Sequence, residues 1–304
     1  MSSSILEALV ERGHKVTVYT STLEPGRVEA GVRVMTQDNT LLNAQPKPHL
    51  IYTHTGGGSA AHKYAYDSHA PLVGVVHNTQ INTDNEMSKF LNLYSMFVFN
   101  SEYTKKTLIE YEGPILHSPL KVNDYKVTRR GANNITELSL SRAKGLDIFV
   151  ELANRMPEYN FLGVVGSYGA QQIPKGDNIT VLPNMDHNAI KSVFAKTRIL
   201  LAPSTVESWG RAAAEAMCSG IPVVASNAGG LVECLDGAGY NIDYDDIDTW
   251  ESTVRELMTS RALYTKQSGL ARARAANIER LSSYELEKTL DAMEALGKRK
   301  VRSL

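Results

Sequence analysis

Short apolar runs alternate with amphipathic stretches along most of the chain. In the first half, apolar runs at 15–20, 32–35, 50–53, 72–77, 96–100 and 115–118 predict strands, and the segments 2–12 and 101–111 predict helices, with Ser101 as an N-terminal cap. In the second half, we expect strands at 135–140, 161–165, 179–182, 198–203 and 221–225, and helices at 146–155, 189–197, 209–219 and 231–235. From residue 249 onward the chain is predicted to be helical, with 284–296 as its last helix. This alternation is typical of an α/β protein with parallel sheets.

The stretch 198–226 carries the most information. An apolar run, a loop, an alanine-rich helix that stops at Gly220 and a second apolar run form a strand–helix–strand unit. Glu207 lies in the loop before the helix, and Glu215 lies inside the helix among alanines. A carboxylate there is costly to bury without a partner, and binding a pair of vicinal hydroxyls would explain it. The free N–H groups at the start of the helix suit a phosphate.

This stretch resembles the Glu-x7-Glu motif of retaining, nucleotide-sugar-dependent glycosyltransferases with the two-domain GT-B fold, in particular glycosyltransferase family 4. The resemblance extends over Pro203-Ser204, Glu207-Ser-Trp-Gly210, Glu215-Ala-Met217, Gly220-Ile-Pro-Val-Val-Ala225, and Gly229-Gly230 with Glu233. The plainer alternative, an ordinary strand–helix–strand unit with two solvated acids, leaves Glu215 unexplained.

The resemblance implies two Rossmann-like domains that face a cleft. The first, residues 1–121, would be the acceptor side, and a C-terminal helix, 284–304, would cross back to it. The second, residues 122–283, would bind the nucleotide-sugar donor. At 304 residues the chain is long enough for two such domains.

The N-terminal half departs from the family pattern, in which a first strand and a glycine-rich loop precede the first helix. Here the chain starts almost inside the helix 2–12. Because the first strand of a doubly wound sheet is central, we expect a rearranged sheet, a strand supplied from elsewhere, or a chain start that omits residues. The glycine run at 55–59 is consistent with close approach to a ligand and equally with a flexible turn.

The resemblance also implies roles for individual residues. Lys144 and Arg142, in the loop after the strand 135–140, would contact the donor diphosphate, where a cation suits the anion. Glu207 would bond to hydroxyls of the donor sugar and Glu215 to those of the ribose. His77, at the end of the strand 72–77, would orient the sugar or the acceptor. Further donor contacts are expected from Ser208, Trp209, Gly210, Gly166 and Met185, whose backbone would hold the base.

Plainer interpretations stay open for several of these residues. Arg142 and Lys144 would then be solvated loop residues, and His77 would cap local backbone. In the functional interpretation, the cations and the start of the helix stabilise negative charge on the leaving diphosphate. By analogy with the family, the sugar transfers by a same-face, ion-pair-like substitution, because no carboxylate is clearly placed as a nucleophile.

No metal and no cofactor are expected. Asp243 and Asp245-Asp246 are assigned to an acidic loop after Tyr240, and we do not expect them to form a metal-binding Asp-x-Asp at a strand end. The nucleotide-diphospho-sugar, UDP- or GDP-linked, would be a substrate, and the acceptor would be a glycan, a lipid-linked sugar or a protein.

Composition bears on nucleic-acid binding, on the redox compartment and on membrane association. A net charge of −1 gives no sign of nucleic-acid binding by bulk electrostatics. Cys218 and Cys234 fall in predicted core elements, which favours a reducing compartment and no disulfide. The sequence shows neither a signal peptide nor an apolar run of roughly 18 residues, so we predict a cytoplasmic protein. The basic tail at 298–302 is expected to be solvated, with weak membrane-surface contact left open.

Two other functions fit the same sequence pattern. One is a nucleotide-sugar epimerase on this architecture, which would turn over without an acceptor. The other is a binding module that keeps the donor pocket but has a degenerate acceptor site. Fold analogy alone does not separate these from a transferase.

Overall fold

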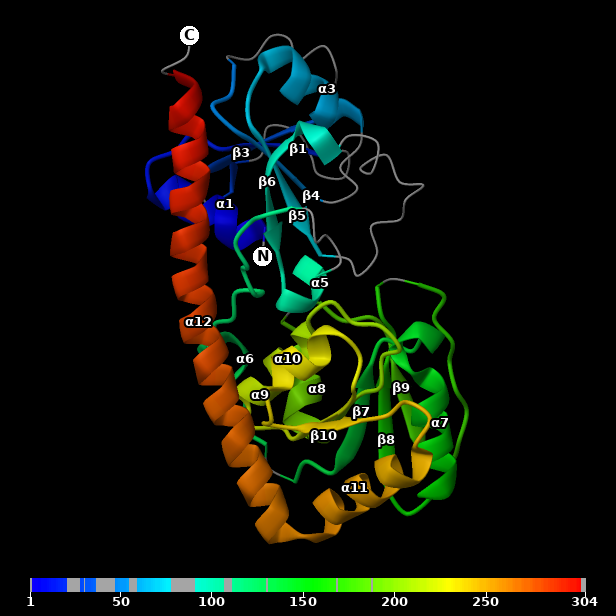
Figure 1. Ribbon diagram of the computed structural model, residues 1–304. Coiled ribbons are helices and arrows are strands. Elements are labelled where there is room, and N and C mark those ends of the chain that lie inside the picture. Colours follow the sequence, from blue (N-terminus) through cyan, green and yellow to red (C-terminus); the bar gives the residue numbers. More distant parts are fainter. Residues whose placement is uncertain are drawn as a thin grey trace. The chain divides into compact units, whose positions relative to one another are not determined.

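The computed structural model describes residues 2–20, 28–29, 31–36, 47–54, 59–77, 91–106, 111–129, 131–167, 169–186 and 188–301. The chain divides into two compact units (Figure 1). Unit 1 comprises Met1–Pro119 and Ser282–Leu304, and unit 2 comprises Leu120–Leu281. Both are mixed α/β structures with parallel strand pairs.

Unit 2 contains a six-stranded parallel sheet. Its elements are α6 (Val122–Tyr125), β7 (Asn134–Leu138), the 3-10 turn η2 (Arg142–Lys144), α7 (Leu146–Arg155), β8 (Asn160–Val164), β9 (Ile179–Leu182), α8 (Ile190–Lys196), β10 (Thr197–Ala202), α9 (Arg211–Cys218), β11 (Val223–Ser226), α10 (Gly230–Leu235), β12 (Tyr240–Ile242), α11 (Ile247–Thr259) and the first half of α12 (Arg261–Val301). The strands are ordered β12-β11-β10-β7-β8-β9. This is the order of a doubly wound fold, and its direction of winding reverses between β7 and β10.

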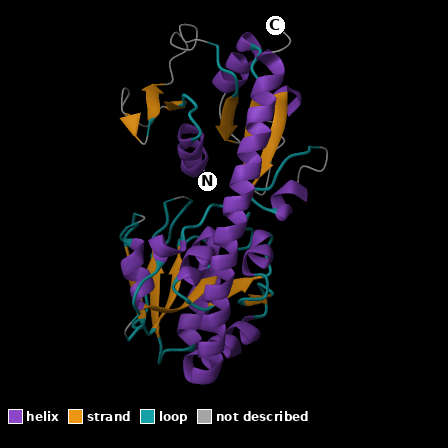
Figure 2. Cartoon of the chain, turned by 90° about the vertical axis from the view of Figure 1, so that its left-hand side faces the viewer, coloured by secondary structure: helices purple, strands orange, loops and turns teal. Residues whose placement is uncertain are grey.

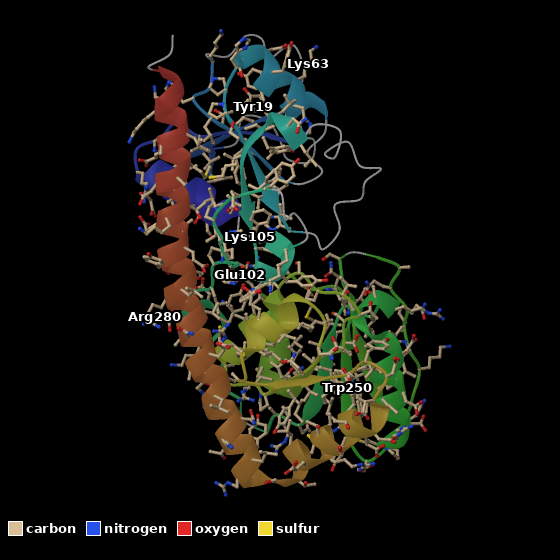
Figure 3. All side chains as sticks on the ribbon, viewed as in Figure 1. Tyr19, Lys63, Glu102, Lys105, Trp250 and Arg280 are labelled. Carbon is tan, nitrogen blue, oxygen red and sulfur yellow. The ribbon has the colours of Figure 1, made fainter. Side chains whose placement is uncertain are left out.

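Helices cover both faces of this sheet and bury its apolar side chains (Figure 2). On one face, Phe149 of α7 and Trp250 of α11 pack against Ile135 and Phe161. The indole N–H of Trp250 donates to the Asp243 carbonyl at 3.0 Å, which fixes the start of α11 (Figure 3). On the other face, α9 and α10 pack against β10 and β11. Burial on both faces explains why β10 and β11 read as nearly continuous apolar runs.

Unit 1 contains two three-stranded sheets among its described residues. Its elements are α1 (Ser2–Glu11), β1 (Thr17–Thr20), β2 (Val28–Glu29), β3 (Val32–Thr36), β4 (Ile51–His54), α3 (Ser59–Ser68), β5 (Leu72–Val76), the 3-10 turn η1 (Leu91–Leu93), β6 (Tyr94–Phe99), α5 (Glu102–Lys106) and the second half of α12. One sheet has the order β1-β3-β2 and the other β4-β5-β6. The predicted cap is confirmed, because Ser101 Oγ accepts from the Thr104 N–H at 3.0 Å.

The second half of α12 contacts the rest of unit 1 through both charged and apolar side chains. Arg12 donates to Asp291 at 2.9 Å and to Glu294 at 3.1 Å. Leu290 and Met293 pack in the same buried cluster as residues of α1 and of the β4-β5-β6 sheet. These contacts attach the C-terminal helix to the N-terminal half of the chain within one compact unit.

Two predicted elements were wrong. The segment 115–118 is not a strand, since Ile115 forms only an isolated bridge with Phe99 and the His117 N–H donates to Glu285 at 2.9 Å. A side chain of α12 thus takes the bond that a sheet ladder would need. The last helix does not begin at residue 284, because α12 runs unbroken through Arg261–Val301, a stretch without proline.

Two further sequence predictions concern the glycine run at 55–59 and the lack of a membrane-spanning segment. The glycines of the run at 55–59 lie outside the described residues. Within the described part of the chain, no helix combines the length and hydrophobicity needed to span a membrane.

Glu137 is a buried carboxyl group on the central strand β7. It is 1% exposed, and neither carboxyl oxygen has a hydrogen-bond partner among the described residues. Burial, with a smaller contribution from the charge of Asp147, raises the pKa of Glu137 well above its ordinary value of 4.5. The folded state therefore binds this proton more tightly than the unfolded chain does.

This raised pKa makes the stability of unit 2 depend on pH. Stability from this group is complete below the unfolded pKa near 4.5 and is lost as the pH rises toward the folded value, by up to about 1.4 kcal/mol per pH unit. Glutamine does not ionise, so we expect the Glu137→Gln variant to be free of this loss. The free energy of unfolding of the variant should therefore increase relative to that of the wild type as the pH rises from 4.5. Urea unfolding followed by tryptophan fluorescence measures it in unit 2, which holds both tryptophans, Trp209 and Trp250. Parallel pH profiles for the two proteins would contradict the buried, protonated state.

Candidate functional site

Unit 2 contains a pocket of about 240 Å³ at the carboxyl ends of β7 and β10. Lys144, Glu207 and the first residues of α9 line it. The pocket lies where the strand order of the sheet reverses, which is where ligands bind in open α/β sheets. Its wall comes from loops that follow neighbouring strands.

The loop after β7 packs directly against the loop after β10. Gly145 has φ +93°, and a Cβ atom there would lie 2.1 Å from the Pro203 carbonyl oxygen, so only glycine allows this approach. The Thr205 N–H donates to the Ala143 carbonyl at 3.0 Å. These contacts place Lys144 opposite the segment that carries Glu207.

The loop after β11 is joined to the loop after β10 in the same way. The Gly230 N–H donates to the Glu207 carbonyl at 2.8 Å. A Cβ on Gly230 would meet the Ser208 carbonyl oxygen at 2.1 Å, so glycine is again required. Three successive loops of the sheet therefore fix the backbone on either side of Glu207.

Lys144 and Glu207 form an ion pair across the pocket, from the Lys144 Nζ to the Glu207 Oε2. Their side chains are 36% and 19% exposed, so solvent only partly screens the pair. Ser204 Oγ donates to the same carboxylate oxygen at 3.5 Å. The sequence assigned both charged residues to one site, and the structure brings them into contact.

The start of α9 supplies backbone donors to the pocket. Gly210 takes a left-handed conformation with φ +106° as the N-terminal cap, and no side chain within the described ranges caps the helix. The first helical bond runs from the Ala214 N–H to the Gly210 carbonyl at 3.1 Å. The N–H groups of Arg211, Ala212 and Ala213 consequently have no carbonyl within the helix, and all three residues line the pocket. This end of α9 suits an anion.

Glu215 does not line the pocket but lies one turn further along α9. Its Oε1 accepts from the Arg211 Nε at 2.7 Å, and its side chain is 12% exposed. The Arg211 Nη2 also donates to the Tyr125 hydroxyl at 3.3 Å. The structure thus gives Glu215 an ion-pair partner that the sequence argument did not foresee.

The other candidates of unit 2 lie around this site in different ways. Arg142 begins η2, is exposed and does not line the pocket. Trp209 is 2% exposed and packs in the core beneath α9. Met185 packs against a core cluster of β8 and α8. Gly166 donates its N–H to Gln171 Oε1 at 2.8 Å.

His77 lies in unit 1, directly after β5. Its ring stacks on that of His54, which ends β4, with the centroids 4.8 Å apart. Burial, aided by the neighbouring charge of His54, lowers the pKa of His77 to about 4. His77 is therefore neutral at pH 7 and able to accept a hydrogen bond.

Two charged residues that line the pocket, Glu137 and Arg211, were not among the predicted site residues. A signal existed for each of them. Glu137 places a carboxylate within a predicted buried strand, and Arg211 places a positive charge in the first turn of the predicted helix 209–219, where the macrodipole disfavours it. Both break a local rule, as residues at functional sites often do.

Comparisons with known proteins agree with this architecture. Residues 138–274 match the model of the family described as Glycosyl transferases group 1. D-inositol 3-phosphate glycosyltransferase of Mycolicibacterium smegmatis is 30% identical over 166 residues, which cover 50% of this chain and 36% of that protein. The matched region spans about a third of the length of the curated relatives.

Solved structures resemble the chain more extensively. Sucrose-phosphate synthase from Thermosynechococcus elongatus has a TM-score of 0.78 at 15% identity, covering 100% of this chain and 93% of that one. Anabaena Alr3699/HepE, solved in complex with UDP-glucose, has a TM-score of 0.68 at 18% identity, covering 90% and 87%. These likenesses establish the α/β fold with parallel sheets that GT-B glycosyltransferases have.

The Lys144–Glu207 pair leads to a prediction about anion binding. Glu207→Gln removes the charge that neutralises Lys144 and leaves the cation facing the start of α9. We expect this variant to bind inorganic pyrophosphate about two- to fivefold more tightly than the wild type, the gain that matches an ion pair of about 0.5–1 kcal/mol. Calorimetry at constant, low ionic strength measures the difference.

Glu151→Gln is the matched control for net charge. Glu151 is exposed on α7, pairs with Arg155 and does not line the pocket. If both variants bind pyrophosphate with the same affinity, Glu207 does not compete for Lys144.

Proposed function

We propose that this protein is a retaining glycosyltransferase that transfers a sugar from a nucleotide-diphospho-sugar to a hydroxyl group of a glycan, a lipid-linked sugar or a protein. One observation carries the proposal: Lys144, Glu207 and the start of α9 meet in a single pocket where the strand order reverses. The match of residues 138–274 to the glycosyl transferase family supports it. The structural likeness to HepE, which was solved in complex with UDP-glucose, supports a UDP-linked donor.

The proposed roles follow from charge and position. The diphosphate lies against the N–H groups at the start of α9 and takes Lys144 as its cation. Breaking the bond between the sugar and the diphosphate builds negative charge on the leaving phosphate, which these groups stabilise because donor binding has already placed them against it. Glu207, released from Lys144, accepts hydrogen bonds from the sugar hydroxyls.

The remaining predicted residues extend the site beyond the pocket. Glu215 holds the ribose hydroxyls, and the backbone near Met185 and Gly166 lies along the nucleoside. Arg142 is exposed at the start of η2, so a contact with the diphosphate requires its side chain to turn toward the pocket. A role for His77 in orienting the sugar or the acceptor stays a prediction.

Donor identity is tested first by a thermal-shift screen of UDP-, GDP-, ADP- and dTDP-sugars, followed by product analysis with mixed glycan and lipid acceptors. We expect one nucleotide class to stabilise the protein and a glycoside with the donor's anomeric configuration to form.

Lys144→Met should lower kcat/KM roughly 100-fold or more, since removal of one preorganised donor to a transition-state charge costs about 2.7–4 kcal/mol. Isomerised donor without an acceptor would identify an epimerase, and stabilisation without any turnover would identify a binding module.

Metal independence is a separate proposal. Lys144 and the start of α9 would stabilise the negative charge of the leaving diphosphate, so we expect the transfer rate to be unchanged in excess chelator. Loss of activity in chelator that Mn²⁺ or Mg²⁺ restores would contradict it.

A further inference from the structure

Arg211 occupies a position that helix stability does not favour. It is the first residue of α9, where its charge faces the positive end of the helix dipole. Its partner Glu215 follows it by four residues, the weaker of the two orders for such a pair. Only Gly210 is required at this turn by its backbone conformation. A stabilising role for the helix therefore does not account for Arg211.

The hydrogen bonds of Arg211 instead orient the side chain of Glu215. The guanidinium Nε donates to Glu215 Oε1, and Nη2 donates to Tyr125, which is 4% exposed and fixed within the core. Burial and the nearby charge of Glu215 raise the pKa of Tyr125 to about 12, so its hydroxyl stays protonated beside the carboxylate. Tyr125 also forms a side-chain hydrogen bond with Glu215, so Arg211 and Tyr125 together orient the carboxylate. A carboxylate has about four acceptor sites, and these two donors therefore leave acceptor capacity for a ligand.

Position along α9 connects this group to the pocket. Arg211 lines the pocket with a side chain that is 57% exposed, and Glu215 lies four residues on, a rise of about 6 Å. A nucleotide whose phosphates lie at the start of the helix would pass Arg211 before its sugar reached Glu215. Arg211 therefore lies between the pocket and Glu215 along the helix.

We propose that Arg211 is a positioning residue that sets the preference of this site for ribonucleotides over 2′-deoxyribonucleotides, by holding Glu215 ready to accept hydrogen bonds from the ribose hydroxyls. This inference rests on the proposed function, since it requires a nucleoside diphosphate in the pocket. This role differs from direct phosphate binding, because Arg211 acts through Glu215. The difference in affinity between a ribonucleotide and its 2′-deoxy counterpart measures the contact with the 2′-hydroxyl alone.

Calorimetry with matched nucleotides tests the proposal. The probes are UDP, ADP and GDP, each compared with its 2′-deoxy counterpart. We expect the wild type to prefer the ribonucleotide roughly tenfold or more in the pair that binds, because an ionised acceptor makes strong hydrogen bonds. Arg211→Leu should reduce this preference to less than about threefold while affinity for the deoxynucleotide stays nearly unchanged. Tyr125→Phe should reduce it by a smaller factor.

Controls and contrary outcomes are distinct. Arg280→Leu, at an exposed arginine of α12 outside the pocket, should keep the wild-type preference (Figure 3). Equal loss of ribo- and deoxynucleotide affinity in Arg211→Leu would overturn the proposal in favour of a general phosphate contact or a folding defect. Wild-type binding without a ribose preference would overturn this inference alone. Absence of any nucleoside diphosphate binding would contradict the proposed function as well.

Discussion

The site in unit 2 depends on the close contact between the loops that follow β7 and β10. Gly145 allows that contact, since any side chain there would collide with the Pro203 carbonyl. Because the two strands pair in the centre of the sheet, the contact lies where the winding reverses. Lys144 precedes Gly145 directly, so the packing that fixes the glycine also fixes the cation. Gly230 repeats the arrangement on the next loop and holds Glu207 from the other side.

Both acids of the Glu-x7-Glu segment are paired with cations, and the two pairs differ in a way that suits different tasks. Glu207 bonds to Lys144 across the pocket, between two loops, so an anion that binds Lys144 competes with Glu207. Glu215 bonds to Arg211 on its own helix, with Tyr125 behind it, so that pair can persist when a ligand arrives. In the proposed function, the diphosphate replaces Glu207 as the partner of Lys144, and the second pair keeps Glu215 in place as an acceptor.

The errors in the sequence predictions have different physical origins. The apolar run at 115–118 has the composition of a strand, yet Glu285, far away in sequence, binds both the ring and the backbone N–H of His117. The helix predicted from 284 is the C-terminal part of a longer helix that begins at Arg261. Arg211 lies four residues before Glu215 within the predicted helix 209–219, so the spacing of this ion pair was present in the sequence and was overlooked.

The sequence by itself determined the α/β class, most strand positions of unit 2 and the presence of Lys144 and Glu207 near strand ends, because apolar periodicity and glycine positions are local properties. Tertiary structure decided the strand order, which brings the ends of β7 and β10 together although they are about 60 residues apart along the chain. It also decided that Arg211 and Glu137 line the pocket and that Glu215 does not. These outcomes depend on which loops pack together and which helix face is covered, and no single stretch of sequence contains that information.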